Sequence, residues 1–201
     1  MLVLGIDEAG RGPLVGSMFI AGVWAPKEVA KSWLLSGLKD SKKLKRDKRD
    51  LLAEQIKKEC SYCKVLEFLP AEIDETNIDH LEFIAMLDLI SRVAGPLEVI
   101  IDCPGYKKSW WKAFSDVIPE KMKYLKLEHK ADEKFAIVSA ASVLAKSARD
   151  FHIDFLGVPN GGYSGEKLTR FIEAEVIKTG RLPVYVRKSW ANAAKFNREA
   201  Q

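Results

Sequence analysis

Two adjacent carboxylates follow an apolar run at the start of the chain, and a glycine-containing loop comes directly after them. The run LVLGI precedes Asp7 and Glu8, and Gly10-Arg11-Gly12 and Pro13 follow. Paired acids at the end of a strand are suited to a metal site, and glycines let backbone approach a ligand closely. Adjacent strand residues point to opposite faces, so both acids can line one site only if the strand twists or ends there.

Two further acids occupy positions where an apolar element begins or ends. Asp102 follows the apolar run LEVII, and ligands in open α/β sheets gather at the carboxyl ends of such strands. The alternative for Asp102 is an acid that marks where the strand meets solvent. Asp132 precedes a long helical pattern, where aspartate is a preferred N-cap. A capping acid can also face a metal, so the two roles are compatible.

The chemistry of these four acids depends on whether they converge. Two carboxylates about 4 Å apart repel by roughly 4 kcal/mol at an effective dielectric constant near 20. A cluster must therefore take up protons or bind cations. Carboxylate oxygens without histidine or cysteine favour Mg²⁺ or Mn²⁺, and two such ions can activate a water and stabilise the leaving oxygen in phosphodiester cleavage.

Basic and aromatic residues elsewhere are compatible with a phosphate-bearing substrate. The segment KDSKKLKRDKRD (39–50) holds seven Lys or Arg in twelve residues, which ordinarily indicates a solvated helix start. Ser41 and Lys42 lie just before that helix, where free amides could hold a phosphate. Lys146 and Arg149 are about one turn apart on the long helix. Tyr163 lies among glycines and could stack on a sugar or base, or simply anchor its loop.

The composition predicts one globular domain. The chain has 201 residues, of which 47% are apolar and 30% charged, and its net charge of +4 permits a nucleic-acid partner. No apolar run reaches the roughly 18 residues of a membrane span, and the N-terminus does not resemble a signal peptide, so we expect a cytoplasmic protein. Cys60 and Cys63 have the spacing of half a zinc site, but a helix end and a strand position explain them as well.

Hydrophobic patterning predicts a mixed sheet with helices on both faces. The predicted strands cover 2–8, 15–24, 62–69, 97–101 and 123–127. The predicted helices cover 27–36, 46–58, 77–93, 107–118, 133–152 and 165–178, with a helical tail over 184–200. A short glycine-bearing link makes the first two strands antiparallel neighbours. The small residues of the long helix indicate close packing on the sheet: Ala136, Ala140, Ala141, Ala145 and Ala148.

These motifs together resemble type 2 ribonuclease H, the ribonuclease HII family, most closely in its archaeal form. The matching segments run in family order along almost the whole chain: GIDEAGRGPLVG (5–16), DSKKL (40–44), AEIDETNI (71–78), IDCPG (101–105), EHKADEKF (128–135), AASVLAKSARD (140–150), GGYSG (161–165) and VRKSW (186–190).

The resemblance implies a fold and a set of roles for named residues. The fold would be a ribonuclease H-like α/β domain over 1–180, with a mixed five-stranded sheet flanked by helices, and a small C-terminal helical extension over 181–201 packed on it. The implied catalytic and metal-binding acids are Asp7, Glu8, Asp102 and Asp132. The implied substrate-binding residues are Gly10, Arg11 and Gly12, which would read the ribonucleotide at an RNA–DNA junction, Tyr163, which would pack on the neighbouring deoxyribose, and Ser41, Lys42, Asn77 and Lys146, which would touch the backbone.

The implied activity is endonucleolytic hydrolysis of RNA in RNA–DNA hybrids and of single ribonucleotides in duplex DNA. Cleavage would fall on the 5′ side of the ribonucleotide, with Mg²⁺ or Mn²⁺ as cofactor, by a monomer that serves ribonucleotide excision repair. Two alternatives are a hybrid-binding module without catalysis and another ribonuclease H-like enzyme, such as a resolvase or type 1 ribonuclease H. The C-terminal AAKFNREAQ lacks the glutamine and paired aromatic residues of a clamp-binding peptide, so we do not expect sliding-clamp binding through the terminus.

Overall fold

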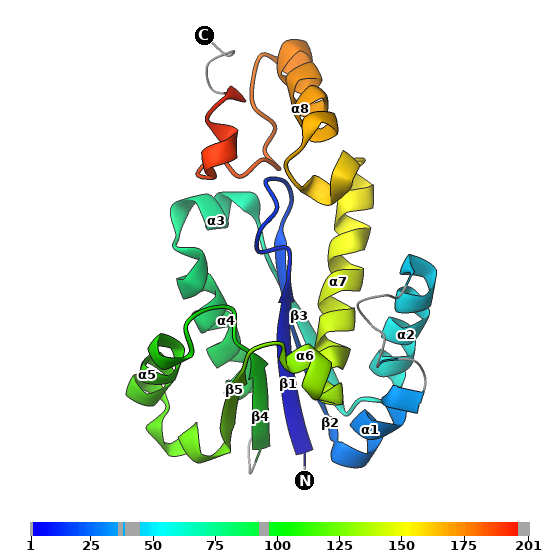
Figure 1. Ribbon diagram of the computed structural model, residues 1–201, viewed down its shortest axis with the longest axis vertical. Coiled ribbons are helices and arrows are strands. Elements are labelled where there is room, and N and C mark those ends of the chain that lie inside the picture. The colour runs from blue at the N-terminus through cyan, green and yellow to red at the C-terminus, as the bar shows by residue number, and fades with distance from the viewer. Residues whose placement is uncertain (1, 36–37, 39–44, 93–96, 197–201) are drawn as a thin grey trace.

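The computed structural model describes residues 2–35, 38, 45–92 and 97–196. Its centre is a five-stranded mixed sheet in the order β3-β2-β1-β4-β5 (Figure 1). The strands are β1 (Leu2–Ala9), β2 (Met18–Pro26), β3 (Tyr62–Phe68), β4 (Leu97–Asp102) and β5 (Leu125–Glu128). β2 is antiparallel to both β1 and β3, whereas β4 is parallel to β1 and β5. The predicted mixed sheet and the antiparallel pairing of its first two strands are confirmed.

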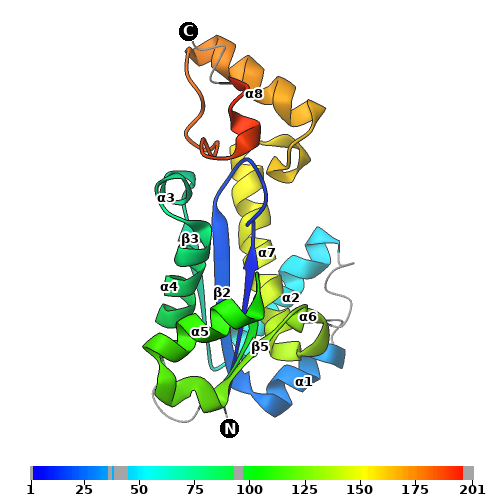
Figure 2. The same cartoon turned by 60° about the vertical axis from the view of Figure 1, so that its left-hand side comes forward.

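Helices cover both faces of the sheet (Figure 2). One face carries α1 (Lys27–Leu35), α2 (Arg46–Glu59), the short α6 (Ala131–Lys134) and α7 (Ala136–Leu156). The other carries α4 (Ile78–Ser91), preceded by α3 (Pro70–Glu75), and α5 (Lys107–Val117), followed by the 3₁₀ helix η2 (Pro119–Tyr124). The sheet is buried on both faces. Successive residues of β1 point to opposite faces, so Val3 packs in the hydrophobic core on the α7 side and Leu4 packs in the core on the α4 side.

Helix α7 approaches the sheet closely in the middle of β1. A Cβ at Gly5 would lie 2.4 Å from the carbonyl carbon of Ile137, so only glycine fits beside the first turn of α7. Ala140, Ala141 and Ala145 continue the contact and are fully buried. The small residues of this helix therefore pack against the sheet as predicted, which fixes the position of α7 relative to the end of β1.

The C-terminal segment, residues 181–196, packs at the end of the molecule where the loop after β1 lies (Figure 1). It follows η3 (Pro159–Gly162) and α8 (Glu166–Thr179), and its Phe196 shares a hydrophobic cluster with Leu14 and Ile172. Within its described residues the only helical element is η4 (Ala191–Ala193), so this tail is less helical than predicted. It follows the surface of the loop instead of forming a helix.

Two further details differ from the predicted elements, and one agrees with them. The predicted helix over 133–152 is interrupted at Phe135, whose backbone is extended, and Asp132 lies inside α6 and does not cap α7. β2 begins at Met18 because Val15 instead pairs with Val186. Cys60 ends α2 and Cys63 lies in β3, which are the two positions that the structural interpretation of their spacing predicted. No described helix is long and apolar enough to cross a membrane.

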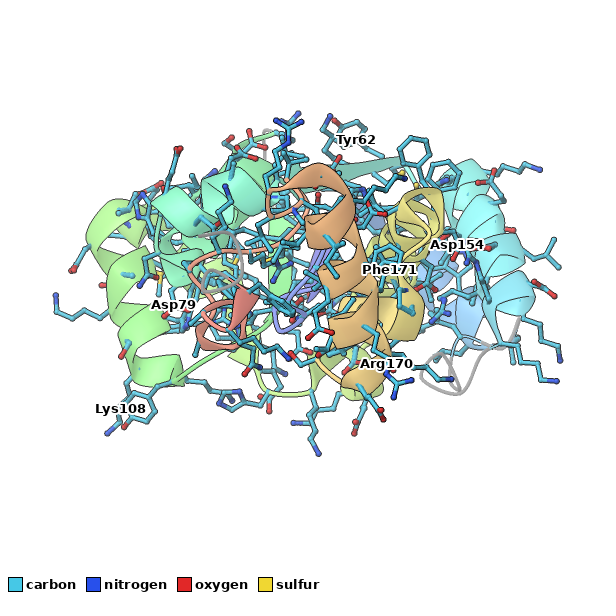
Figure 3. The ribbon with its side chains drawn as sticks, turned by 90° about the horizontal axis from the view of Figure 1, so that it is seen from above. Tyr62, Asp79, Lys108, Asp154, Arg170 and Phe171 are labelled. Atoms are coloured by element: carbon cyan, nitrogen blue, oxygen red, sulfur yellow. The ribbon has the colours of Figure 1, made fainter. Side chains whose placement is uncertain are left out.

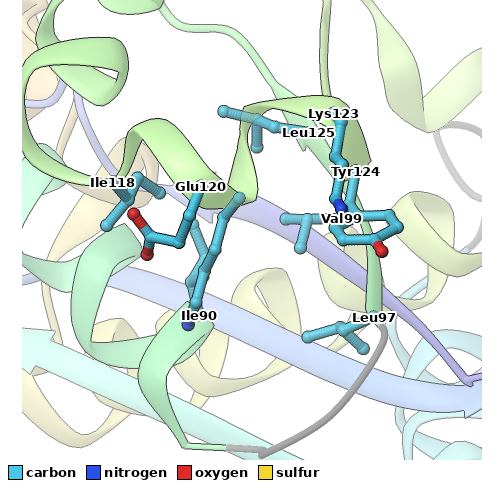
Figure 4. Close-up of a pocket in the computed structure, with 9 residues that line it drawn as sticks. Ile90, Leu97, Val99, Ile118, Glu120, Lys123, Tyr124 and Leu125 are labelled. Atoms are coloured by element: carbon cyan, nitrogen blue, oxygen red, sulfur yellow. The ribbon is translucent and has the colours of Figure 1, made fainter.

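An apolar pocket lies at the end of β4 remote from Asp102 (Figure 4). It has a volume of about 200 Å³ and is lined by residues that begin β4 and β5, together with side chains of η2. The carboxylates identified in the sequence are at the opposite ends of these strands. This pocket is therefore separate from the candidate site.

Candidate active site

Parallel strands bring three of the four acids together. Ile6 of β1 pairs with Ile101 of β4, so the next residues, Asp7 and Asp102, end neighbouring strands at the same edge of the sheet. Asp132 arrives from α6, just after β5, which pairs with β4 through Asp102 and Glu128. One carboxylate oxygen from each of Asp7, Asp102 and Asp132 lies within 4.8 Å of the others. We call these three residues the acidic cluster.

The acidic cluster has the donor set and spacing of a divalent metal site. Its donors are all carboxylate oxygens, the hard ligands that Mg²⁺ and Mn²⁺ prefer. Two such charges at this separation repel by about 3 kcal/mol at a dielectric constant near 20. Asp7 is 7% exposed, and burial, together with repulsion from Asp102, raises its pKa from 3.8 to about 8. A bound cation would remove both penalties, so the residues present fit such an ion.

Glu8 is close to the acidic cluster but does not belong to it. Its carboxylate lines an adjoining cleft, and its Oε2 accepts a hydrogen bond from the Arg11 amide at 3.3 Å. Burial raises the pKa of Glu8, and the charge of Asp102 raises it further. The alternation of a strand explains the difference, because Asp7 and Glu8 leave β1 on different sides.

A hydrogen-bond chain connects α7 to the acidic cluster. Lys146 Nζ donates to Ser142 Oγ at 2.7 Å, and the Ser142 hydroxyl bonds the Asp7 carboxylate, which partly offsets the rise in the pKa of Asp7. Both residues are on the turn of α7 that faces β1. The close approach of α7 at Gly5 is therefore what places a lysine beside the acids.

We expect the metal-free protein to lose stability as pH rises from about 4 to 8. Unfolded Asp7 releases its proton near its ordinary pKa of 3.8, whereas folded Asp7 holds it until about 8, so over that range the folded state binds more protons. The variant Asp7→Asn should flatten this dependence and raise the melting temperature at pH 8 in EDTA by at least about 3 °C. Thermal unfolding between pH 4 and 8 measures the effect.

Excess Mg²⁺ should restore wild-type stability at pH 8 and leave Asp7→Asn almost unchanged. Asp116→Asn is the matched control, because Asp116 is exposed and pairs with Lys112 one helical turn away. A wild-type melting temperature in EDTA that rises between pH 4 and 8 would contradict the burial of Asp7 beside Asp102.

The loop of Gly10, Arg11 and Gly12, here called the glycine loop, is held tightly. Gly10 has φ +91°, and a Cβ there would lie 2.8 Å from the Ser17 carbonyl oxygen, so this position requires glycine. The Arg11 guanidinium turns toward α4, where it bonds Asp79 Oδ1 at 2.5 Å and the fully buried Glu82. Burial raises the pKa of Glu82 to about 7, against the lowering effect of Arg11.

Two residues that support the glycine loop had no assigned role in the sequence analysis. Arg187 is fully buried and donates to the carbonyl oxygens of Gly10 and Arg11. Glu82 of α4 accepts a hydrogen bond from the Arg11 guanidinium. Arg187 belongs to the segment VRKSW. Its position directly after the apolar run LPVYV is the sequence feature that could have identified it as a buried arginine. Glu82 lies in the apolar helix pattern of α4 and carried no comparable signal.

A basic cleft of about 310 Å³ adjoins the acidic cluster. Lys146 and Arg149 both line it, which confirms that they present charge on one side of α7, and Arg49 of α2 lies there as well. Tyr163 lines the cleft and is 51% exposed, with the Arg149 guanidinium 5.2 Å from its ring centroid. The exposed ring can therefore meet a ligand in the cleft.

Of three further predicted substrate contacts, two lie in a segment that the structure does not describe and the third caps a helix. Ser41 and Lys42 lie outside the described residues. Asn77 is the N-cap of α4, where its Oδ1 accepts a hydrogen bond from the Asp79 amide at 2.8 Å. This cap orients the first turn of α4, which carries the Asp79 partner of Arg11.

A serine, a histidine and a glutamate are also aligned nearby but cannot act as a hydrolytic triad. Ser17 Oγ is 3.4 Å from His152 Nε2, and His152 Nδ1 is 3.4 Å from Glu67 Oε1. Ser17 is 1% exposed, and its own amide donates to the same Nε2 at 3.3 Å. A nucleophile must reach its substrate, so this constellation has no catalytic role and instead ties the residue before β2 to β3 and α7.

Comparisons with known proteins agree with this geometry. The sequence model described as Ribonuclease HII matches residues 4–193. A Ribonuclease HII from Methanopyrus kandleri is 37% identical over 206 residues, which cover 99% of this chain and 95% of the relative. The crystal structure of ribonuclease H2 from Pyrococcus horikoshii superposes with a TM-score of 0.85 at 30% identity, covering 100% and 99% of the two chains. The Archaeoglobus fulgidus RNase HII in a complex with PCNA superposes with a TM-score of 0.79 at 32% identity, covering 94% and 95%.

Proposed function

Because this chain belongs to the ribonuclease HII family and is thus a nuclease that cleaves the RNA strand of RNA–DNA hybrids, we propose that it also cuts at single ribonucleotides in duplex DNA. Cleavage falls on the 5′ side of the ribonucleotide. The observation that carries the proposal is the acidic cluster beside a basic cleft lined by the glycine loop and Tyr163.

We propose that the acidic cluster and Glu8 are the catalytic acids and hold Mg²⁺ or Mn²⁺. Divalent ions supply an activated water and charge stabilisation for the departing 3′ oxygen when they are bound. The cluster's residues do the positioning: β1 and β4 hold Asp7 and Asp102 side by side, and the Ala131 amide donates to Asp102 Oδ1 at 3.2 Å, which links that carboxylate to α6. Lys146, next to Ser142, places a positive charge where the scissile phosphate would lie.

Substrate selection is the role we propose for the opposite wall of the cleft. Gly10 and Gly12 allow backbone contact with the ribose, whose 2′-hydroxyl distinguishes RNA from DNA. Arg11 anchors this loop to α4, and Tyr163 packs on the next deoxyribose. Contacts to the nucleic-acid backbone are proposed for Ser41, Lys42, Asn77 and Lys146.

One digestion tests the proposal directly. The substrate is duplex DNA with a single embedded ribonucleotide, incubated with Mg²⁺, with Mn²⁺ and with EDTA, and the products are mapped to the nucleotide. We expect one cut 5′ of the ribonucleotide that requires the ion. Retention of the substrate without cleavage would indicate a binding module. Cleavage only within several consecutive ribonucleotides would indicate another ribonuclease H-like activity.

Lys146→Gln should weaken hybrid binding by a similar factor for every sequence. One lost phosphate contact reduces the slope of log K against log salt by about one. Fluorescence anisotropy at several salt concentrations, in Ca²⁺ to prevent turnover, measures that slope. Lys31→Gln is the control, because Lys31 is exposed on α1, at the far end of the molecule from the cleft (Figure 1). Equal slopes for Lys146→Gln and wild type would remove Lys146 from the contact set.

We propose that the protein works as a monomer, with residues 1–180 as the catalytic domain and residues 181–201 packed on it. The Archaeoglobus relative was solved with PCNA. The residues AAKFNREAQ lack the aromatic pair of a clamp-binding peptide, so we propose that these residues do not bind a clamp. Light scattering with and without a clamp protein tests both points.

A further inference from the structure

Arg187 is a fully buried charged group behind the glycine loop. It is 0% exposed, and its guanidinium donates to three backbone carbonyl oxygens: Gly16 at 2.9 Å, Arg11 at 2.8 Å and Gly10 at 2.5 Å. Among the residues that the structure describes, no carboxylate forms an ion pair with it. Burial lowers the pKa of Arg187 to about 10, so it stays charged at neutral pH. Burying a charge is costly, and the hydrogen-bond partners that compensate the buried guanidinium are these three carbonyl groups.

The segment around Arg187 is anchored independently of the guanidinium. The Arg187 amide donates to the Leu14 carbonyl oxygen at 2.9 Å, and Val186 pairs with Val15. Asp74 of α3 accepts hydrogen bonds from the amides of Lys188 and Ser189, each at 2.8 Å. The backbone of this segment therefore has its own supports, and the guanidinium bonds two carbonyls of the glycine loop and the carbonyl of Gly16.

Trp190 adds a second contact of the same kind. Its indole Nε1 donates to the Gly12 carbonyl oxygen at 3.4 Å, and the Arg187 guanidinium lies 5.1 Å from its ring centroid. Arg187 and Trp190 together engage a carbonyl of all three residues of the glycine loop. Residues 176 to 178 positions later in the chain thus hold the loop that lines the cleft.

We propose that Arg187 is a positioning residue for ribonucleotide selection, because it orients the carbonyls of the glycine loop. This proposal rests on the function proposed above. A fully buried side chain cannot touch a nucleic acid, so its effect passes through Gly10 and Arg11. The planar fork of arginine can serve several acceptors at fixed angles, whereas lysine offers a point charge. A lysine at position 187 would keep the positive charge but not the planar shape, so substitution can separate the effect of the guanidinium's geometry from that of its charge.

The experiment compares Arg187→Lys and Arg187→Gln with wild type on two substrates. One is duplex DNA with a single ribonucleotide, and the other is a continuous RNA–DNA hybrid without a junction. We expect both variants to lower the ratio of kcat/KM for the single-ribonucleotide substrate over the hybrid by about tenfold or more, through KM and kcat together. The Mg²⁺ dependence of hybrid cleavage should stay unchanged, because the acidic cluster is not contacted.

Arg170→Lys is the matched control. Arg170 is three-quarters exposed on α8, where it pairs with Glu166, and it lies well apart from Asp79 of α4 when the molecule is seen from above (Figure 3). The control should retain the wild-type ratio. A folded Arg187→Lys protein with an unchanged ratio would overturn the proposal, since charge alone would then suffice.

Two milder variants decide the matter if the Arg187 variants do not fold. Trp190→Phe removes the hydrogen bond to Gly12, and Asp74→Asn weakens the attachment of Lys188 and Ser189. Both should lower the ratio in the same direction by a smaller factor, and an unchanged ratio in both would overturn the proposal. A wild-type protein that leaves single ribonucleotides uncut would instead reject the proposed function.

Discussion

Replacing Asp102 with asparagine is expected to reduce the rate of hydrolysis of every substrate by more than about a hundredfold. Mutation of a residue that only hydrogen-bonds to a metal ligand already costs about 10- to 100-fold in metal affinity or activity. Asp102 ends β4 at the centre of the acidic cluster, and its charge also raises the pKa of Asp7 and Glu8. Asparagine preserves the shape and the oxygen that accepts from the Ala131 amide. The fold should therefore survive, and only the negative charge is lost.

The same loss is expected for Asp7→Asn and Asp132→Asn. Single-turnover cleavage of a hybrid in Mg²⁺ measures it, and thermal unfolding in EDTA shows whether each variant is folded. Asp116→Asn should cleave at the wild-type rate, because Asp116 pairs with Lys112 on the surface of α5. Wild-type activity in a folded Asp102→Asn protein would exclude the acidic cluster as the catalytic centre.

Replacing Tyr163 with alanine is expected to lower kcat/KM on single-ribonucleotide duplexes by about 5- to 150-fold, the range that a lost stacking contact of about 1–3 kcal/mol implies. The ring is half exposed in the free protein, and Asn160 Nδ2 donates to the Tyr163 carbonyl oxygen at 2.9 Å. Removing the ring therefore leaves the loop in place. Continuous hybrids should lose less, because the tyrosine is proposed to pack at the junction.

Two variants separate the contributions of the tyrosine. Tyr163→Phe keeps the ring that packs on a sugar and should remain close to wild type if packing dominates. Tyr124→Ala removes a partly exposed tyrosine of η2 at the other end of the sheet and should have no effect on either substrate. A loss of equal size on both substrates in Tyr163→Ala would remove its proposed role in sensing the junction.

Local patterns were sufficient for the order and type of the main elements. The apolar runs of β1 and β4 and the helical period of α4 depend on neighbours in sequence, and all three form where the patterning places them. The errors fall where distant contacts decide. Met18 begins β2 because Val15 pairs with Val186, and residues 184–190 follow the glycine loop instead of forming a helix. The short α3 was missed, although Pro70 at its first turn is a helix-start signal.

The candidate acids were identifiable for the same local reason, since each one begins or ends an element. Their roles remain predictions, and the structure adds how they meet. Asp7, Asp102 and Asp132 converge because β1 and β4 are parallel and in register, which no pattern within either strand specifies. Glu8 lies outside the cluster because neighbours in a strand diverge.

The residue types alone establish which chemistry the chain can carry: oxygen ligands at strand ends, a glycine loop that can approach a ligand, and lysines and arginines for phosphate. Which of these groups lie together, and which residues hold them in place, depends on how the folded chain packs. Arg187 and Glu82 show the reason, because each is fully buried against a loop more than 70 positions away. Side-chain type is a property of one position, whereas proximity is a property of the whole packed chain.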